Sequence, residues 1–176
     1  MKKKYNLALT PTCKGYEAVK LANKLAHIAD NYLLGEKSLP HVTLYQFQAE
    51  ENDIDSIWKK VCGTWEEKPI NLIFNKFSCI TFNDDIFWVS LLPDNLDVLN
   101  KMHVFIANIL LLPVKKAFDP HMTLINTKHK EYETEVEKLS RSYEPIEDNF
   151  LLSLGASDDI GQLTELIHIV NEKTNF

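Results

Sequence analysis

Two nearly identical pentapeptides carry the side chains best suited to chemistry in this chain. The segment PHVTL covers residues 40–44, and PHMTL covers residues 120–124. At average frequencies of about 5% per residue, a four-residue match recurs at a given place with odds on the order of 10⁻⁵. A single His-x-Thr on a strand is usually structural, because threonine favours strands and histidine often only accepts a hydrogen bond. The second copy therefore indicates a repeated task.

Side chains two residues apart on a strand point to the same side. His41 and Thr43 are therefore expected to face one way, as are His121 and Thr123. Two imidazoles and two hydroxyls suit in-line displacement at phosphorus. One neutral ring takes a proton from the nucleophile and one protonated ring gives a proton to the leaving oxygen, while hydroxyls stabilise the charge on the non-bridging oxygens. We predict that these four residues are catalytic and that no metal ion or other cofactor is needed.

The similarity extends beyond the pentapeptides to the elements that must position them. YNLALTP (residues 5–11) and FWVSLLP (residues 87–93) are both strand-like and end at proline. A helical pattern of apolar residues follows each of them, over residues 18–33 and 96–109. Each pentapeptide is then followed by a polar helical segment, over residues 53–65 and 131–141.

A further strand is expected in each half, beginning in residues 67–74 and 143–150, and residues 166–170 form the last strand. The chain therefore divides into halves of about 1–82 and 83–176. We predict a single α+β domain of two pseudosymmetric lobes. Each lobe is an antiparallel sheet with helices outside, and the sheets face each other across a central groove. The five glycines form neither a dinucleotide-binding fingerprint nor a P-loop.

Composition restricts the partners and the compartment. The net charge of −6 argues against coating long duplex nucleic acid through phosphate neutralisation. Three cysteines without paired spacing indicate reduced thiols in a cytoplasm. No apolar run approaches the roughly 20 residues of a membrane span, and no apolar stretch of signal-peptide length follows the initial lysines. We expect a soluble, cytoplasmic monomer that does not engage membranes.

The paired H-x-T motifs, about 80 residues apart on duplicated halves, resemble those of the 2H phosphoesterase superfamily. This superfamily includes the proteins called 2′-5′ RNA ligases and the cyclic nucleotide phosphodiesterases. The resemblance covers nearly the whole chain. It implies two pseudosymmetric lobes around a groove and metal-independent cleavage, or in a few members joining, of phosphodiester bonds. By resemblance, His41, Thr43, His121 and Thr123 fill both motifs. The implied substrate is a 2′,3′-cyclic phosphate or a 2′-5′ phosphodiester of a nucleotide or an RNA end.

Three further residues are candidates for substrate binding. Tyr45 continues the face of His41 and Thr43 and could stack on a base, or it could simply pack at the end of the strand. Its counterpart, Ile125, is apolar. Lys128 and Lys130 follow the second motif in a small basic cluster that could contact phosphate, although such clusters are usually solvated.

Other functions remain open at this stage. A nucleotide-binding or RNA-end-binding module would hold the phosphate without turnover, although Lys or Arg would serve that task better than paired histidines. An RNA 2′-5′ ligase would run the same chemistry in reverse. A metal hydrolase would use both histidines with Asp119 or Cys79, but the metal-ligand spacings are missing.

Overall fold

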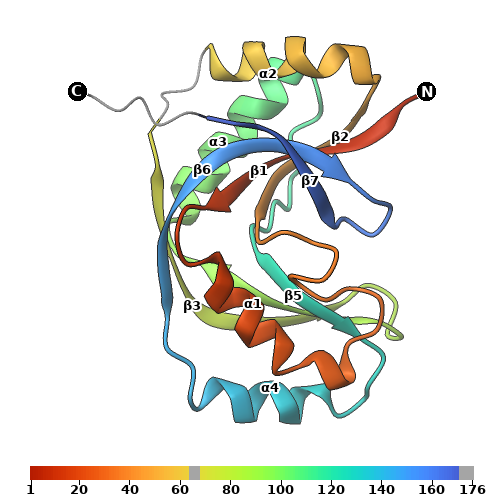
Figure 1. The fold of residues 1–176 in the computed structure, drawn as a ribbon, viewed down its shortest axis with the longest axis vertical. Coiled ribbons are helices and arrows are strands. Elements are labelled where there is room, and N and C mark those ends of the chain that lie inside the picture. The colour runs from red at the N-terminus through yellow and green to blue at the C-terminus, as the bar shows by residue number, and fades with distance from the viewer. Residues whose placement is uncertain (64–67, 171–176) are drawn as a thin grey trace.

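The structure is a computed structural model, and it describes residues 1–63 and 68–170. Within these residues, one seven-stranded antiparallel sheet and four α-helices make up most of the fold (Figure 1). The strands are β1 (Lys3–Pro11), β2 (Val42–Ala49), β3 (Ile70–Thr81), β4 (Phe87–Pro93), β5 (Met122–Thr127), β6 (Ile146–Ser157) and β7 (Leu163–Ile169). The helices are α1 (Gly15–Asn23), α2 (Ile54–Cys62), α3 (Leu96–Leu110) and α4 (Tyr132–Ser140), with 3₁₀ turns at Ala26–Ile28 and Glu51–Asp53.

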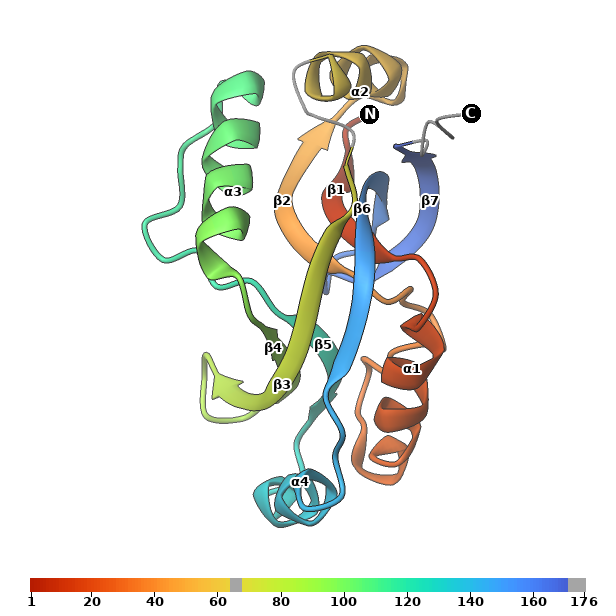
Figure 2. The ribbon, with the colours of Figure 1, turned by 90° about the vertical axis from the view of Figure 1, so that its left-hand side faces the viewer.

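The sheet bends into two lobes that meet at β3 and β6. The strand order is β2-β1-β6-β3-β4-β5, and β7 pairs with β6. We call β2, β1, β7 and residues 150–157 of β6 lobe 1, and β3, β4 and β5 lobe 2. Figure 2 shows β3 and β6 running side by side between the two lobes. The α+β class is confirmed, but the two facing sheets expected from the sequence are joined into one continuous sheet.

The strand registers relate the two lobes by a pseudo-twofold axis. Phe150 of β6 pairs with Pro11 of β1, as Phe74 of β3 pairs with Pro93 of β4. Between the central strands, Ile70 lies opposite Phe150 and Phe74 lies opposite Ile146. The two phenylalanine rings meet with centroids 5.5 Å apart. The axis therefore passes through the β3–β6 pairing.

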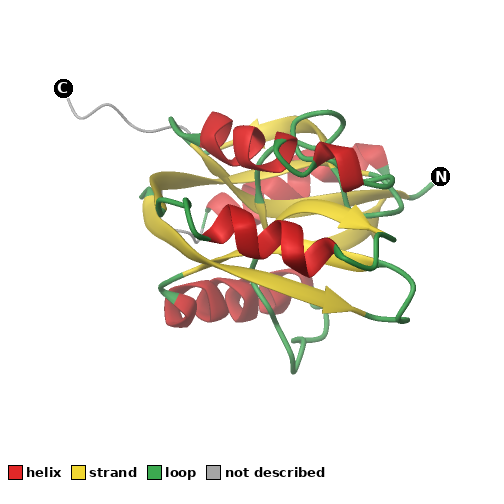
Figure 3. Ribbon diagram, turned by 90° about the horizontal axis from the view of Figure 1, so that it is seen from below, coloured by secondary structure: helices red, strands yellow, loops and turns green. Residues whose placement is uncertain are grey.

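Each lobe borrows a strand from the other half of the sequence. β3 follows β2 in the chain but pairs with β4 of lobe 2, and β6 follows β5 but pairs with β1 of lobe 1. The helices cross over as well, since α1 packs near β5 and α3 packs against β2. In Figure 3 the strands run between helices on opposite sides of the molecule. This exchange ties the lobes into one hydrophobic core.

The first long helix expected from the sequence is shorter than predicted. Helix α1 ends at Asn23, and the chain from Asp30 to Leu34 runs extended beside β5. Asp30 N–H and Leu34 N–H donate to the carbonyls of Asn126 and Leu124, at 2.8 and 2.9 Å. These bonds satisfy the exposed edge of β5, so tertiary pairing outweighs the helical pattern of residues 24–33. The parts of the predicted segments that fall on residues 64–67 lie outside the described residues.

In the described part of the chain, no helix has the length and apolar character needed to cross a membrane.

Candidate active site

The four motif residues meet in one cavity of about 270 Å³ between the lobes. His41 immediately precedes β2 and His121 immediately precedes β5, so both rings lie at strand entrances. Thr43 and Thr123 are the second residues of these strands, and both are half-buried. The prediction that the two motifs converge is therefore in accord with this geometry.

Both histidines are anchored in the same way. Nδ1 of His41 lies 2.6 Å from the carbonyl oxygen of Leu39, and Nδ1 of His121 lies 2.7 Å from that of Asp119. A carbonyl can only accept, so Nδ1 carries a proton in each ring. Nε2 is then the atom left to accept a proton from a nucleophile or, when protonated, to donate one. Leu39 and Asp119 both precede a proline, which favours the extended backbone that points their carbonyls back at the rings.

The two rings differ in environment. His41 is only 5% exposed, and burial lowers its pKa to about 4 against the partial support of the Leu39 carbonyl. Positive charge on nearby His121 lowers the pKa of His41 further. The side chain of His121 is 36% exposed, and its Nδ1 lies 3.9 Å from Oδ2 of Asp119. At neutral pH His41 is therefore a neutral ring, ready to accept a proton.

A β-bulge follows each motif threonine. The register shifts between Leu7 and Ala8 on β1, where Leu44 is the extra residue, and between Val89 and Ser90 on β4, where Leu124 is. A bulge bends the strand and changes which residues share a face. Its presence at the same place in both lobes indicates that it belongs to the site architecture.

The bulge corrects the expectation for Tyr45. This residue does not continue the face of Thr43, because the extra residue turns its side chain to the helix side of the sheet. Tyr45 is buried, its hydroxyl donates to the Pro113 carbonyl at 2.7 Å, and its ring stacks on His103 with centroids 5.2 Å apart. Gln46 lines the cavity instead. The packing role that the sequence left open for Tyr45 is the one that the structure supports.

The basic cluster also lies away from the cavity. Lys128 and Lys130 are exposed beyond the end of β5, and neither lines the cavity. Nζ of Lys128 lies 3.3 Å from Oδ2 of Asp30. The lysine that does line the cavity is Lys115, which comes from the segment before His121.

Sequence reasoning missed one wall of the cavity. Its members share an apolar or aromatic surface and come from β3, β4 and the segment before β2: Tyr32, Ile80, Phe82 and Trp88. Trp88 of β4 is half-buried, and its ring meets Tyr32 edge-on. Phe82 is 83% exposed at the turn after β3. The sequence offered no specific signal for this wall, because none of these residues stands in a motif.

Of the ligands of the alternative metal site, both histidines line the cavity and Asp119 lies beside His121, but Cys79 lies apart from them. Cys79 lines a separate hollow between β3 and α4. The described residues contain no group of three His, Cys, Asp or Glu side chains that could hold a metal ion.

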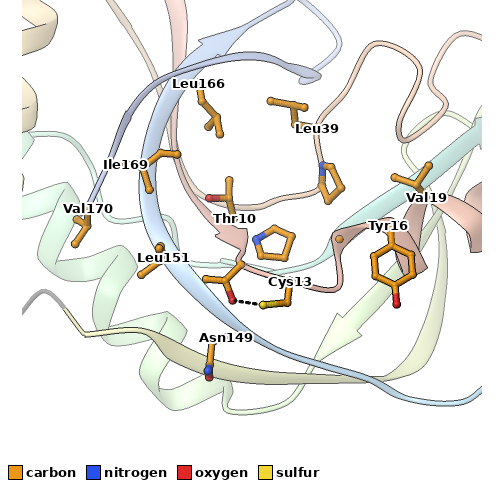
Figure 4. Close-up of a pocket in the computed structure, with 14 residues that line it drawn as sticks. Thr10, Cys13, Tyr16, Val19, Leu39, Asn149, Leu151, Leu166, Ile169 and Val170 are labelled. Atoms are coloured by element: carbon orange, nitrogen blue, oxygen red, sulfur yellow. Dashed lines mark hydrogen bonds between the residues drawn. The ribbon is translucent and has the colours of Figure 1, made fainter. Parts of the chain in front are cut away.

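A larger hollow of about 960 Å³ is lined by residues of β1, β6 and β7 and of the segment before His41 (Figure 4). Leu39 and Pro40, which lead into His41, form one side of it, and Leu166 and Ile169 of β7 line it as well. None of the described residues that line it is charged. The peptide that orients His41 therefore also lines this uncharged space.

The comparisons with known proteins rest on structure alone. No family model matches the chain, and no curated protein matches its sequence. Solved structures do match. Escherichia coli LigT complexed with 3′-AMP has a TM-score of 0.58 at 12% identity, over 98% of this chain and 100% of that chain. Usb1 of Kluyveromyces marxianus has a TM-score of 0.54 at 11% identity, over 97% of each chain.

These two proteins are members of the 2H phosphoesterase superfamily. A structure described as a phosphoesterase also matches, with a TM-score of 0.53 at 10% identity over 98% of this chain and 100% of that chain. The chain therefore has the fold of 2H phosphoesterases, as the resemblance of its motifs predicts.

Proposed function

We propose that the chain is a metal-independent phosphodiesterase acting on a 2′,3′-cyclic phosphate or a 2′-5′ phosphodiester of a nucleotide or an RNA end. The observation that carries this proposal is the meeting of two equivalently anchored histidines and two threonines in one cavity. The fold shared with LigT and Usb1 supports phosphoesterase chemistry as the class.

The environments of the two rings support a division of labour. For a cyclic phosphate, Nε2 of neutral His41 takes a proton from water while the water oxygen bonds to phosphorus. The bond from phosphorus to one ribose oxygen breaks, and protonated His121 gives its proton to that oxygen. The hydroxyls of Thr43 and Thr123 donate to the non-bridging oxygens as their charge grows. A proton is gained at one ring and lost at the other, so the pair is reset by proton exchange with water.

The cavity walls support a nucleotide as the substrate. Phe82 and Trp88 offer ring faces on which a base can stack. Lys115 lines the cavity with its Nζ 5.5 Å from the centroid of the Tyr45 ring, and its ammonium is a candidate for a contact with phosphate. LigT is itself seen with 3′-AMP and with ATP.

Two alternatives use the same cavity. A nucleotide-binding or RNA-end-binding module would show affinity without turnover, and an RNA 2′-5′ ligase would join ends rather than cleave them. The lowered pKa of His41 favours an enzyme, because a neutral buried imidazole adds no charge that would hold phosphate. We also propose that the protein acts as a cytoplasmic monomer.

The test is a substrate panel in excess EDTA. It contains 2′,3′-cyclic mononucleotides, 2′-5′ dinucleotides and RNA ending in a cyclic phosphate, and the products are identified by regiochemistry. We expect hydrolysis of at least one of them, and a loss of at least ~10³-fold in His41→Ala and His121→Ala. Activity that requires a divalent ion, or folded histidine variants that keep the wild-type rate, would overturn the mechanism. Binding without turnover would favour the module, and ligation products would favour the ligase.

A further inference from the structure

Unpartnered buried polar atoms gather around the cavity. Among the described residues, four buried side-chain atoms have no hydrogen-bond partner: Nδ2 and Oδ1 of Asn6, Oγ of Ser90 and Oε1 of Gln162. Each of these residues adjoins one that lines the cavity, because Asn6 pairs with Gln46, Ser90 pairs with Thr123, and Gln162 follows Gly161. Buried polar groups normally find partners. Asn6 lies behind Gln46 in lobe 1 and Ser90 lies behind Thr123 in lobe 2, so both lobes hold unpartnered polar atoms directly behind residues that line the cavity.

Gln46 is the member of this group that reaches the cavity. Its Nε2 donates to Oγ of Ser157 at 2.9 Å, and this bond fixes the direction of the carboxamide. Within the described part of the chain, its Oε1 and second N–H have no protein partner. The fully buried amide of Asn6 lies on the neighbouring strand, directly opposite Gln46 and on the same side of the sheet.

The corresponding residue of lobe 2 has protein partners for its amide, so the fold does not require an open amide at this position. Asn126 lies five residues after His121, as Gln46 lies five after His41. Oδ1 of Asn126 accepts from the backbone N–H groups of Asn31 and Tyr32 at 3.0 and 2.9 Å, and Nδ2 donates to Oδ1 of Asn31. That side chain is 1% exposed, and both its Oδ1 and its Nδ2 have protein partners. At this pseudosymmetric position, Asn126 of lobe 2 binds the segment before β2, whereas Gln46 of lobe 1 keeps polar atoms available to the cavity.

The two walls of the cavity offer different contacts. Ile80, Phe82 and Trp88 of lobe 2 present apolar and aromatic surface, whereas Gln46 of lobe 1 presents one acceptor beside one donor. A base that stacks on the first wall turns an edge toward the second. A glutamine amide matches an exocyclic amino group beside an unprotonated ring nitrogen, as in the bidentate contact to adenine.

We propose that Gln46 selects nucleobases that carry an exocyclic amino group, adenine above all, over bases that carry an oxo group at the same place. This inference rests on the proposed function, since it assigns the base subsite of that cavity. Oε1 accepts from the amino group, and the N–H that Ser157 leaves free donates to the ring nitrogen.

The test compares adenosine with inosine 2′,3′-cyclic phosphate, which differ only at the amino group and the adjoining ring nitrogen. We expect kcat/KM to favour adenosine by about 10-fold or more in the wild type. Gln46→Met keeps the length of the side chain and removes both hydrogen bonds, so the ratio should fall to near one. Gln46→Glu keeps an acceptor for the amino group, but it loses the N–H that donates to the ring nitrogen of adenine and gains an acceptor for the N1–H of inosine, so its ratio should fall below the wild-type value. Gln48→Met, an exposed glutamine two residues along β2, should match the wild type.

Equilibrium binding of adenosine and inosine 3′-monophosphates separates this inference from the proposed function. A preference for the adenosine ligand that is lost in Gln46→Met supports the inference even if no phosphodiester is hydrolysed. A wild type without base preference overturns it, as does a folded Gln46→Met variant that keeps the preference. Hydrolysis with equal rates on both bases would leave the phosphodiesterase intact and remove the role of Gln46.

Discussion

At the scale of single residues, His41 and His121 are held by equivalent hydrogen bonds but lie in different surroundings. The Nδ1 bonds of His41 and His121 differ by 0.1 Å, yet one ring is buried and the other is one-third exposed. Pseudosymmetry therefore supplies two copies of the imidazole, and burial gives them different surroundings. Acid–base catalysis needs such a difference, because one ring must be neutral while the other is protonated.

This difference predicts the shape of the pH profile. The pKa of His41 is lowered to about 4, so its neutral form is present above that pH and lost below it. We expect a bell-shaped kcat/KM whose acid limb lies near pH 4 to 5, well below that of an ordinary histidine, and whose alkaline limb reports loss of the acid's proton. Steady-state kinetics between pH 3.5 and 9 measures both limbs, which belong to the coupled pair. An acid limb at pH 6.5 or above would contradict the assignment of His41 as the base.

A substrate with a good leaving group tests the other half of the assignment. An aryl phosphodiester expels a stabilised phenolate that needs no proton. We expect such a substrate to recover most of the activity lost in His121→Ala and little of that lost in His41→Ala. Recovery of the His41 variant alone would mean that the two roles are reversed.

The threonine hydroxyls are predicted to act in the transition state. Thr43→Val and Thr123→Val keep the β-branched shape that suits a strand and remove the donor. Each should lower kcat by roughly 10²-fold with little change in thermal stability. Thr164→Val, an exposed position on β7, is the matched control and should keep full activity. Near-full activity in both motif variants would make these hydroxyls simple strand residues.

At the scale of elements, the bulges decide which residues reach the site. Alternation alone places Tyr45 beside Thr43, but the extra residue at Leu44 moves Tyr45 out and Gln46 in. Tyr45→Phe should therefore leave kcat/KM near the wild-type value. It should lower the free energy of unfolding by about 1 kcal/mol, because it removes the hydrogen bond to Pro113. Urea unfolding together with kinetics checks both parts, and a large loss of activity with unchanged stability would return Tyr45 to the substrate site.

The sequence predicted features that depend on local pattern. The paired motifs, the prolines that set them and the order of strands and helices all follow from residue types and spacing. The bulge at Leu44 does not, because it arises from how β2 pairs with Ala8 of β1. The extended path of residues 30–34 beside Ile125 also depends on a distant partner, because these residues have a helical pattern but pair with the open edge of β5.

At the scale of the whole molecule, the exchange of β3 and β6 holds the two motifs in one frame. By local sequence, β3 and β6 could each pair with strands of their own half. The exchange is favoured only by the complete core, so it cannot be predicted from sequence pattern. The consequence is that the cavity holding the four motif residues lies between lobes joined by the β3–β6 pairing and by the contact of Phe74 with Phe150. The relative placement of the histidines is therefore a property of the global fold.

Global stability should in turn depend on the protonation of His41. Its pKa is about 4 in the folded protein and about 6.5 in an unfolded chain, so the unfolded state binds the proton more tightly. The resulting stabilisation is fully present above pH 6.5 and is lost as pH falls through 4. At pH 4.5 the loss amounts to about 2 kcal/mol relative to pH 7. Carboxylates also titrate in this range, so the measured quantity is the difference between wild type and a variant.

His41→Gln removes the titrating ring and keeps a polar side chain at the same place. We expect the wild type to lose about 2 kcal/mol more than His41→Gln between pH 7 and pH 4.5 in urea unfolding. His129→Gln, at an exposed position, should follow the wild type at both values. An equal loss in wild type and His41→Gln would show that His41 titrates alike in the folded and unfolded states. Burial would then not explain why His41 is neutral at pH 7.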